Sequence, residues 1–535
     1  MAAARGAFNK GKSEMSRQNF MASVAIAAMM LGATGITPAA AETLVTMNTV
    51  QIFSTIDPAK ISDYTDYMGA VNLYDALVTV DGKGNLTPRL ASSWDVSADA
   101  KEVTYHLRED AHFSDGTPVT AADVVYSFER LLRINLGPAN LFADVLKPGS
   151  IVAVDDHTVK FTLSKTFAPF LATVPSVFIV NSKVVEANKG TDDAQTYLST
   201  NVAGSGGYLL KSWDRGSQMT IVRDPKYYGG WNDSPIDTVH WVITSDESTV
   251  KSMAASGELT MTSQFQSPET YDSLRAMDRF NVIKASTASV FYLKFNTKKA
   301  PTDDVHIRKA IACATDYETI QTQINPGVPI SGPLPDTFAD FVAKDLPVPK
   351  LDLDCAKAEI AKSAYAGKEI PITLQYVAEA KFEEDVALLM QSTLEPLGFK
   401  VTMQPDPWNR VTDLATKLET SPNMSEIFFE ATYPSPDSMF FTQYDSKAAG
   451  TWASLEWLQD PEVDAMIEKA RGTGDVAEQA TIYKELQHKL VDMQPDAFLE
   501  TQVIQHAMDK CLTGFQYIPM QSVSYDFKLY SWTCK

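Results

Sequence analysis

The stretch FSDGTPVTAADV, residues 113–124, carries the local signals that decide the fold around it. Its Asp-Gly pair marks a turn, because glycine adopts the backbone angles that tight turns need. Thr120 and Asp123 have the spacing of a capping box, which predicts a helix from this point that continues to about Leu131. Residues 103–107, just before the stretch, alternate between apolar and polar. This alternation predicts a half-buried strand.

Helix and strand patterns alternate along the rest of the chain. Residues 151–154 and 159–163 flank Asp155-Asp156-His157 and predict a hairpin. Helices are predicted over 306–314, 355–365, 382–397, 461–471 and 477–493, and strands over 370–376 and 400–404. The alternation after about residue 291 predicts an α/β lobe, whereas the part before it is richer in short strands.

Length and charge narrow the possible classes of function. A chain of 535 residues is longer than one hydrophobic core usually organises, so two large lobes with a cleft between them are expected. The composition, 44% hydrophobic and 21% charged, is that of a globular protein. The net charge of -21 argues against binding to nucleic acid or to anionic lipid, because both carry negative charge.

The N-terminal residues predict export from the cytoplasm. A basic stretch ends at Arg17, an apolar run spans 20–36, and an Ala-x-Ala pattern precedes Glu42. These features predict a signal peptide over residues 1–41 and a mature chain that starts at Glu42. Met15 is an alternative start, and the residues around Arg17 leave both the general and the twin-arginine export routes open. No lipid-anchor cysteine stands at the cleavage point, so we expect a free periplasmic protein that is not embedded in the membrane.

Four cysteines, an even number in an exported chain, predict two disulfides. Three pairings are possible, and proximity in sequence favours Cys313 with Cys355 and Cys511 with Cys534. Each would stabilise the fold by about 3 to 4 kcal/mol through loop closure. A metal site is the alternative for these residues, but CxxC spacing and a neighbouring His pair are absent, so no metal ligand is predicted.

Several blocks of the sequence resemble the family 5 solute-binding proteins of bacterial ABC importers. They match in order and spacing, and together they cover most of the chain after residue 41. The blocks are Asn85 to Trp94, Tyr105 to Arg108, Phe113 to Val124, Gly204 to Tyr208, Arg223 to Tyr228, Leu293 to Thr297 and Val305 to Ala310. Most of these residues have structural roles, so they indicate the fold without marking the ligand.

The resemblance implies a two-lobed α/β periplasmic binding protein, similar to type II, with an extra subdomain in the first lobe. We therefore expect a first lobe over 42–290 with an inserted subdomain at about 87–200, and a second lobe over 291–504. The aromatic and strand-like segment 505–535 is expected to return to the first lobe. The resemblance also implies a cleft that closes around a solute.

Ligand-binding residues are also implied by the resemblance. Family members carry an Asp that pairs with the amino group of a bound peptide, and Thr432 stands at that position. A hydroxyl cannot provide a charge-assisted bond, so Glu430 is the expected substitute; the alternative is an ordinary carboxylate at a strand end. Tyr433 lies in the same stretch, and Trp408 matches an aromatic residue beside the cleft of relatives.

The loop after the first strand of the mature chain matches another ligand-lining stretch of the family. It contributes Gln51, Phe53 and Ser54 as candidate ligand contacts. Tyr292, by contrast, is expected in the hinge or the core.

No catalytic constellation is predicted from the sequence. The glycines around Ser205 lack the spacing of a nucleophile elbow, and the seven His residues have no metal-ligand spacing. The leading hypothesis is a monomeric, non-enzymatic receptor without cofactor that delivers a solute to an ABC permease and its ATPase. A peptide or peptide-like solute is expected, with an opine, an oligosaccharide or a metal chelate as alternatives within this class. A secreted hydrolase is the alternative from another class.

Overall fold

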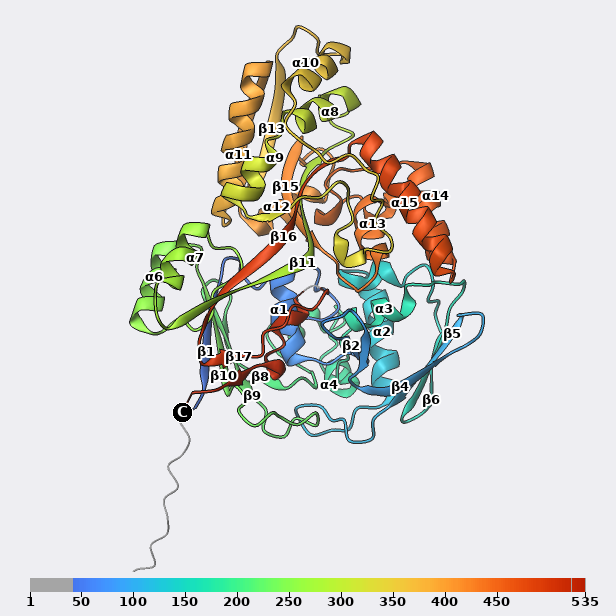
Figure 1. The fold of residues 1–535 in the computed structure, drawn as a ribbon. Helices are drawn as coiled ribbons and strands as arrows, with labels where there is room; N and C mark the ends of the chain where they lie inside the picture. The colour runs from blue at the N-terminus through green and yellow to red at the C-terminus, as the bar shows by residue number, and fades with distance from the viewer. Residues whose placement is uncertain (1–41, 521, 535) are drawn as a thin grey trace, which may run out of the picture. The chain divides into compact units, whose positions relative to one another are not determined.

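Two long antiparallel strands connect the two halves of the fold. They are β11 (Phe280–Phe295) and β16 (Asp496–Asp509), and they run obliquely across Figure 1. We call the residues before Phe280 and after Asp509 the first half, and the residues between Phe295 and Asp496 the second half. This computed structural model describes residues 42–520 and 522–534, so the predicted signal peptide lies outside the described residues. The first seven residues of β11 include exposed positions, whereas 287–295 is buried throughout. Such a run is expected where a strand enters the middle of a sheet that is covered on both faces.

The first half is built on a sheet of order β1-β10-β9-β8. Its strands are β1 (Leu44–Thr49), β8 (Tyr208–Asp214), β9 (Gln218–Arg223) and β10 (Thr238–Ile243). Helix α1 (Tyr64–Leu73) is almost entirely buried. Asp63 caps its first turn by accepting a hydrogen bond from the Asp66 N–H at 3.0 Å.

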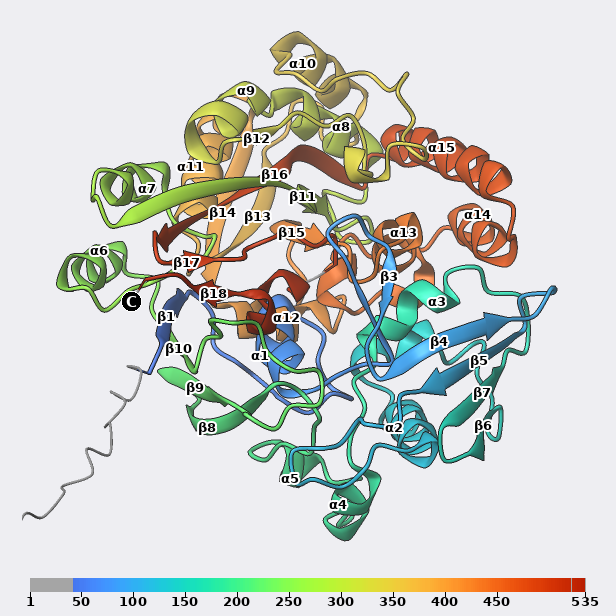
Figure 2. The same ribbon diagram turned by 60° about the horizontal axis from the view of Figure 1, so that its bottom comes forward.

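The capping-box stretch follows strand β5 of a second sheet, of order β4-β5-β7-β6, and opens helix α2, which Figure 2 shows beside this sheet. Its strands are β4 (Ala91–Val96), β5 (Glu102–Leu107), β6 (Ile151–Asp155) and β7 (Thr158–Thr162). Asp123 accepts a hydrogen bond from the Thr120 N–H at 2.9 Å, and α2 (Ala121–Ile134) buries Val124, Phe128 and Leu131. The predicted strand, capping box, helix and hairpin are therefore confirmed.

The second half contains a six-stranded sheet of order β12-β16-β11-β15-β13-β14. The strands not yet given are β12 (Gly327–Val328), β13 (Ile370–Val377), β14 (Phe399–Asp406) and β15 (Met424–Glu430). The main helices are α8 (Val305–Ala314), α10 (Leu353–Lys362), α11 (Lys381–Leu394), α12 (Trp408–Ala415), α13 (Pro436–Tyr444), α14 (Pro461–Gly472) and α15 (Val476–Met493). The predicted elements of this half are confirmed to within a few residues. Helix α11 ends earlier than predicted, because Pro396 removes a helical N–H donor and the last residues form a 3-10 turn.

The remaining elements are short. They are β2 (Val78–Val80), β3 (Leu86–Pro88), α3 (Phe170–Thr173), α4 (Ser182–Ala187), α5 (Gln195–Leu198), α6 (Glu247–Ser256), α7 (Pro268–Arg275), α9 (Tyr317–Thr319), β17 (Leu512–Thr513) and β18 (Ser531–Trp532). Within 42–520 and 522–534, no helix has the length and apolarity needed to span a membrane.

The C-terminal segment is less strand-like than predicted. Among the described residues after Asp509, 510–520 and 522–534, only two-residue strands and single 3-10 turns occur, because Gly514 and Ser522 adopt positive φ angles that interrupt extended structure. The segment is attached to α1 through Asn72. The Asn72 side chain donates to the Tyr525 carbonyl at 2.9 Å and accepts from the Phe527 N–H at 2.8 Å.

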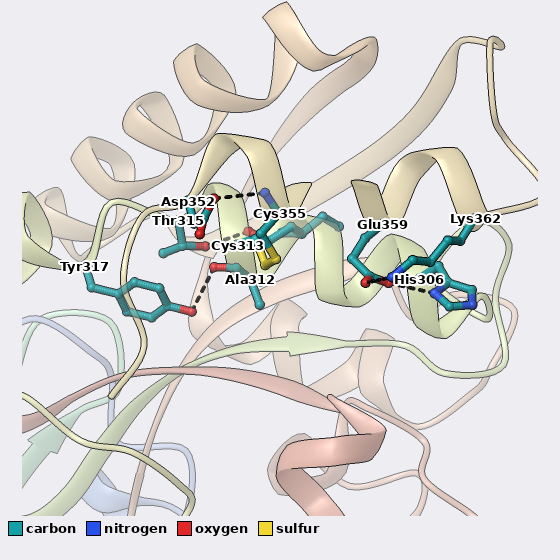
Figure 3. Close-up of a disulfide and its surroundings, with 10 residues drawn as sticks. His306, Ala312, Cys313, Thr315, Tyr317, Asp352, Cys355, Glu359 and Lys362 are labelled. Atoms are coloured by element: carbon teal, nitrogen blue, oxygen red, sulfur yellow. Dashed lines mark hydrogen bonds and ion pairs between the residues drawn. A yellow bond between two sulfur atoms is a disulfide. The ribbon is translucent and has the colours of Figure 1, made fainter. Parts of the chain in front are cut away.

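The two disulfides have the pairing that proximity in sequence favours. Cys313 pairs with Cys355, and Cys511 pairs with Cys534. Figure 3 shows that the first bond joins α8 to α10, where the Asp352 N–H also donates to the Cys313 carbonyl at 2.7 Å. This prediction is confirmed, and each bond joins residues within one half of the fold.

Candidate functional site

An open cavity lies where elements of the two halves face each other. The first half contributes the loop after β1, helix α1 and the loop before α7. The second half contributes β15, the segment from β13 to α11, the start of α12 and Trp452. The lining residues are Val50, Gln51, Tyr64, Gln264, Phe265, Ser289, Val377, Ala380, Glu383, Trp408, Ile427, Phe428, Glu430 and Trp452.

Among the described residues, two hydrogen bonds join the halves beside the cavity, at Trp408 and at Glu430. The indole Nε1 of Trp408 donates to the Asp63 carboxylate at 3.4 Å. The hydroxyl of Tyr517, in the C-terminal segment, donates to the Glu430 carboxylate at 2.8 Å. The same hydroxyl accepts a bond from the Ala288 N–H of β11 at 2.6 Å. The halves are therefore in direct contact at both Trp408 and Glu430.

Aromatic rings form much of the cavity wall. Phe428 stacks on Phe291 with ring centroids 4.2 Å apart. Trp408 meets Trp452 edge to face at 5.2 Å, and Tyr64 packs in the same way on Phe265. Such rings provide large apolar contact surfaces, while the indole and phenol groups keep polar atoms at the rim.

The charged groups that line the cavity are acidic. They are Glu383 and Glu430, and within the described residues no Lys, Arg or His lines it. Burial raises the pKa of Glu430 to about 7, although the bond from Tyr517 partly opposes this shift. Burial also raises the pKa of Glu383 well above its usual value, even though this carboxylate accepts a bond from the Val377 N–H at 2.7 Å. In the part of the chain that the structure describes, neither carboxylate has a cationic partner.

Three of the residues expected from the sequence lie together in this cavity: Gln51, Trp408 and Glu430. The Gln51 side-chain carbonyl accepts a bond from the Thr65 hydroxyl at 3.2 Å, which fixes it beside α1. Trp408 opens helix α12, and Glu430 ends strand β15. Residues 51, 408 and 430 therefore converge only through the tertiary fold.

Phe53 and Ser54 do not line the cavity. Phe53 is fully buried and packs edge to face on Trp241, with ring centroids 5.5 Å apart. The Ser54 hydroxyl donates to the carboxylate of Asp66, in the first turn of α1. The loop after β1 thus presents only its first residues, up to Gln51, to the cavity.

Thr432 and Tyr433 also lie outside the residues that line the cavity. The Thr432 hydroxyl is within 3.1 Å of the Ser438 hydroxyl, in the turn that opens α13. Tyr433 is buried and donates to Asp437 at 2.8 Å. Tyr292, expected in the hinge or core, is fully buried and donates to the Pro333 carbonyl at 3.0 Å.

Sequence reasoning missed several residues of the wall, notably Tyr64, Phe265, Glu383, Phe428 and Trp452. Phe428 had a usable signal, because alternate residues of a strand share one face and Phe428 lies two positions from Glu430. The other four belong to segments far apart in the chain. Their convergence follows from how the two halves meet, which no local pattern encodes.

The cavity is suited chemically to reversible binding of an organic solute. Apolar and aromatic walls with a few polar groups are typical of small-ligand sites. Gln51 and Gln264 offer amide groups, Ser289 and Tyr64 offer hydroxyls, and the two glutamates offer carboxyl groups.

Comparison with known families supports the resemblance seen in the sequence. Residues 85–451 match the model of the bacterial extracellular solute-binding proteins, family 5. The probable D,D-dipeptide-binding periplasmic protein DdpA of Escherichia coli K12 is 31% identical over 478 residues, which cover 87% of this chain and 90% of that protein. The periplasmic oligopeptide-binding protein OppA of the same organism is 26% identical and covers 89% of this chain and 91% of its own length.

Solved structures share the fold. The periplasmic binding protein DppA from Helicobacter pylori, in complex with the peptide STSA, superposes with a TM-score of 0.82. The match covers 92% of this chain and 98% of that one at 20% sequence identity. The predicted two-lobed α/β binding-protein fold is therefore confirmed.

Proposed function

Because this chain belongs to the family 5 bacterial extracellular solute-binding proteins, we propose that it is the periplasmic receptor of an ABC importer for a peptide or peptide-like solute. The observation that carries this proposal is the cavity between the two halves, where Trp408 bonds to Asp63 and Tyr517 bonds to Glu430. The halves are the two lobes of the receptor. Relatives named as dipeptide- and oligopeptide-binding proteins support the class of solute.

The proposed mechanism is closure of the lobes around the solute. Strands β11 and β16 connect the lobes, and their pairing shifts register between Ser286 and Val290, next to the cavity residue Ser289. Such an irregularity is a natural place for bending. The solute favours the closed state because it contacts both lobes only there. The closed receptor then presents both lobes to the permease, and the ATPase subunits drive transport.

Glu430 is proposed to bind an amino group of the solute. It lines the cavity, while the hydroxyl of Thr432 is occupied with Ser438. A carboxylate paired with an ammonium group provides the charge-assisted bond that Thr432 cannot supply. The receptor releases its solute unchanged and has no catalytic role in this proposal.

Mass spectrometry of material purified from the periplasm is the direct test. Native spectra are expected to show one bound solute per monomer, and denaturing spectra a chain that begins at Glu42 with two disulfides. Calorimetry on protein stripped of ligand is expected to show saturable binding of the released solute without turnover. Conversion of a bound peptide to new products at a steady rate would instead support a hydrolase.

A further inference from the structure

Glu426 is a carboxylic acid buried next to the cavity, and no described residue forms a hydrogen bond with its carboxyl group. Its side chain is 1% exposed, and both carboxylate oxygens lack a hydrogen-bond partner among the described residues. Buried polar groups in proteins are nearly always hydrogen-bonded, and an unpaired buried carboxylate is strongly unfavourable. At the edge of a binding cavity, a partner brought by the ligand explains such a group.

The position of Glu426 directs it toward the cavity. Residues 426, 428 and 430 alternate along β15, so their side chains share one face of the sheet. Phe428 and Glu430 line the cavity, which places Glu426 one step deeper on the same face. Glu383, in the first turn of α11, lines the same end and is only 3% exposed. The charge of Glu383 contributes to raising the pKa of Glu426 well above its usual value, after burial itself.

No basic side chain of the described chain pairs with these two acids. Lys381, at the start of α11, pairs with Glu384 and Asp385 instead. The N-terminus of α11 adds only a partial positive charge, much weaker than a full counter-charge. A third acid nearby, Glu379, also has a buried oxygen without a partner.

Aromatic rings complete this end of the cavity. Phe382 meets Phe428 edge to face at 5.6 Å, and Phe265 is stacked on Phe382 at 6.5 Å. Aromatic faces attract ammonium and guanidinium groups, and the attraction is strongest where water is excluded. Acids and rings together therefore favour an organic cation over a neutral side chain.

We propose that the inner end of the cavity, formed by Glu383, Glu426 and the Phe428 ring, binds an ammonium or guanidinium group at the far end of the solute. This inference rests on the proposed function for the class of solute, and it narrows that class to peptide-like molecules with a basic side chain. Glu383 contacts the cation from the cavity wall. Glu426, which lies deeper on the same face of β15, supplies the second negative charge.

A matched pair of dipeptides tests the proposal. Calorimetry on ligand-free protein compares Ala-Lys with Ala-(Nε-acetyl-Lys), which differ in the side-chain charge. The wild type is expected to bind Ala-Lys at least about 10-fold more tightly, as a buried charge-assisted contact implies. Glu383→Gln and Glu426→Gln are each expected to reduce this preference to about 2-fold or less, while the neighbouring control Glu384→Gln keeps it.

A stability measurement separates this role from a structural one. Glu426→Met removes the unpaired carboxyl, so the ligand-free variant is expected to have an equal or higher Tm at pH 7.5 together with a lost preference for Ala-Lys. A lower Tm in this variant would show that Glu426 supports the fold and would overturn the assignment.

Further outcomes distinguish this inference from the proposed function. Equal binding of both dipeptides would overturn the cation subsite and keep the peptide receptor. Binding of agmatine, a guanidinium cation without a peptide bond, but of neither dipeptide would keep the subsite and overturn the peptide proposal. Binding of none of the three probes would overturn both.

Discussion

Affinity for an amine-bearing solute is expected to fall steeply in mild acid, because Glu430 must ionise to bind it. The pKa of Glu430 rises from an ordinary value of 4.5 to about 7 in the ligand-free protein. At pH 7.5 about three quarters of the protein then carries the carboxylate, and at pH 5.5 only about 3% does. A dipeptide amine is mostly charged over this range. We therefore expect Kd to increase by about 25-fold between pH 7.5 and pH 5.5.

The surroundings of Glu430 determine how the measurement is controlled. Tyr517 donates to it, and the hydroxyls of Tyr64 and Tyr525 lie near enough for its charge to raise their pKa values. These phenols stay neutral throughout the range, whereas the other cavity acids also titrate with raised pKa values. Calorimetry on Glu430→Gln isolates the contribution of this one residue. The variant should bind the dipeptide weakly at both pH values, with the pH dependence reduced to a few-fold.

The raised pKa of Glu430 also predicts how the stability of the ligand-free protein depends on pH. An acid whose pKa is higher in the folded than in the unfolded state destabilises the fold. The cost is largest above the pKa of the folded state and disappears as the pH falls to the pKa of the unfolded state. For Glu430 this cost is about 3 kcal/mol at pH 8 and absent below about pH 4.5, other groups aside. Urea unfolding at several pH values should show a shallower dependence in Glu430→Gln. A wild-type Kd that changes less than two-fold between pH 7.5 and 5.5, or an unchanged slope in the variant, would refute this reasoning.

Three further predictions concern packing, charge and crosslinks. Replacing Cys313 and Cys355 by Ser should lower the free energy of unfolding by about 4 kcal/mol, since the bond closes a loop with a sequence separation of 42, and urea unfolding measures this loss. Arg130→Ala should destabilise the protein by about 3 to 5 kcal/mol in the same assay, because it leaves Asp57 buried without the two 2.7 Å bonds it now accepts. Trp408→Ala should weaken solute binding by about 10- to 100-fold in calorimetry, since the ring lines the cavity and its indole donates a hydrogen bond to Asp63 in the other half. Circular dichroism should show little change in secondary structure. An unchanged affinity would contradict this role.

Local signals in the sequence determined most elements of the fold correctly. The capping box at Thr120 and the strand pattern near residue 370 depend only on neighbours a few positions away, so they can be predicted without knowledge of the tertiary structure. The disulfide pairing followed because each pair is close in sequence and lies within one half of the fold. The C-terminal segment was overestimated as strand, because aromatic composition alone does not reveal positive φ angles such as that of Ser522.

The binding cavity was predictable only in part, because it depends on orientation and on distant partners. Gln51 and Phe53 are two residues apart in one loop, yet the core contact with Trp241 turns Phe53 away from the cavity. Glu383 looked like any acid in the first turn of a helix, where such residues are common. Its separation from basic side chains is a property of the assembled fold, in which Lys381 pairs with other acids.

In the proposed mechanism, the uncompensated acids would couple ligand binding to closure of the lobes. In this structure Glu383 and Glu426 are buried and Glu430 is half-buried, and within the described residues none of the three has a cationic partner, so ionising them costs free energy unless a cation is present. Opening the lobes would return Glu430 and Glu383 to water and remove much of this cost. A cationic solute removes it in a different way, by supplying the missing charge inside the closed cavity. Under the proposed mechanism the empty receptor is therefore biased toward opening and the loaded receptor toward closure, a difference in state that a permease could recognise.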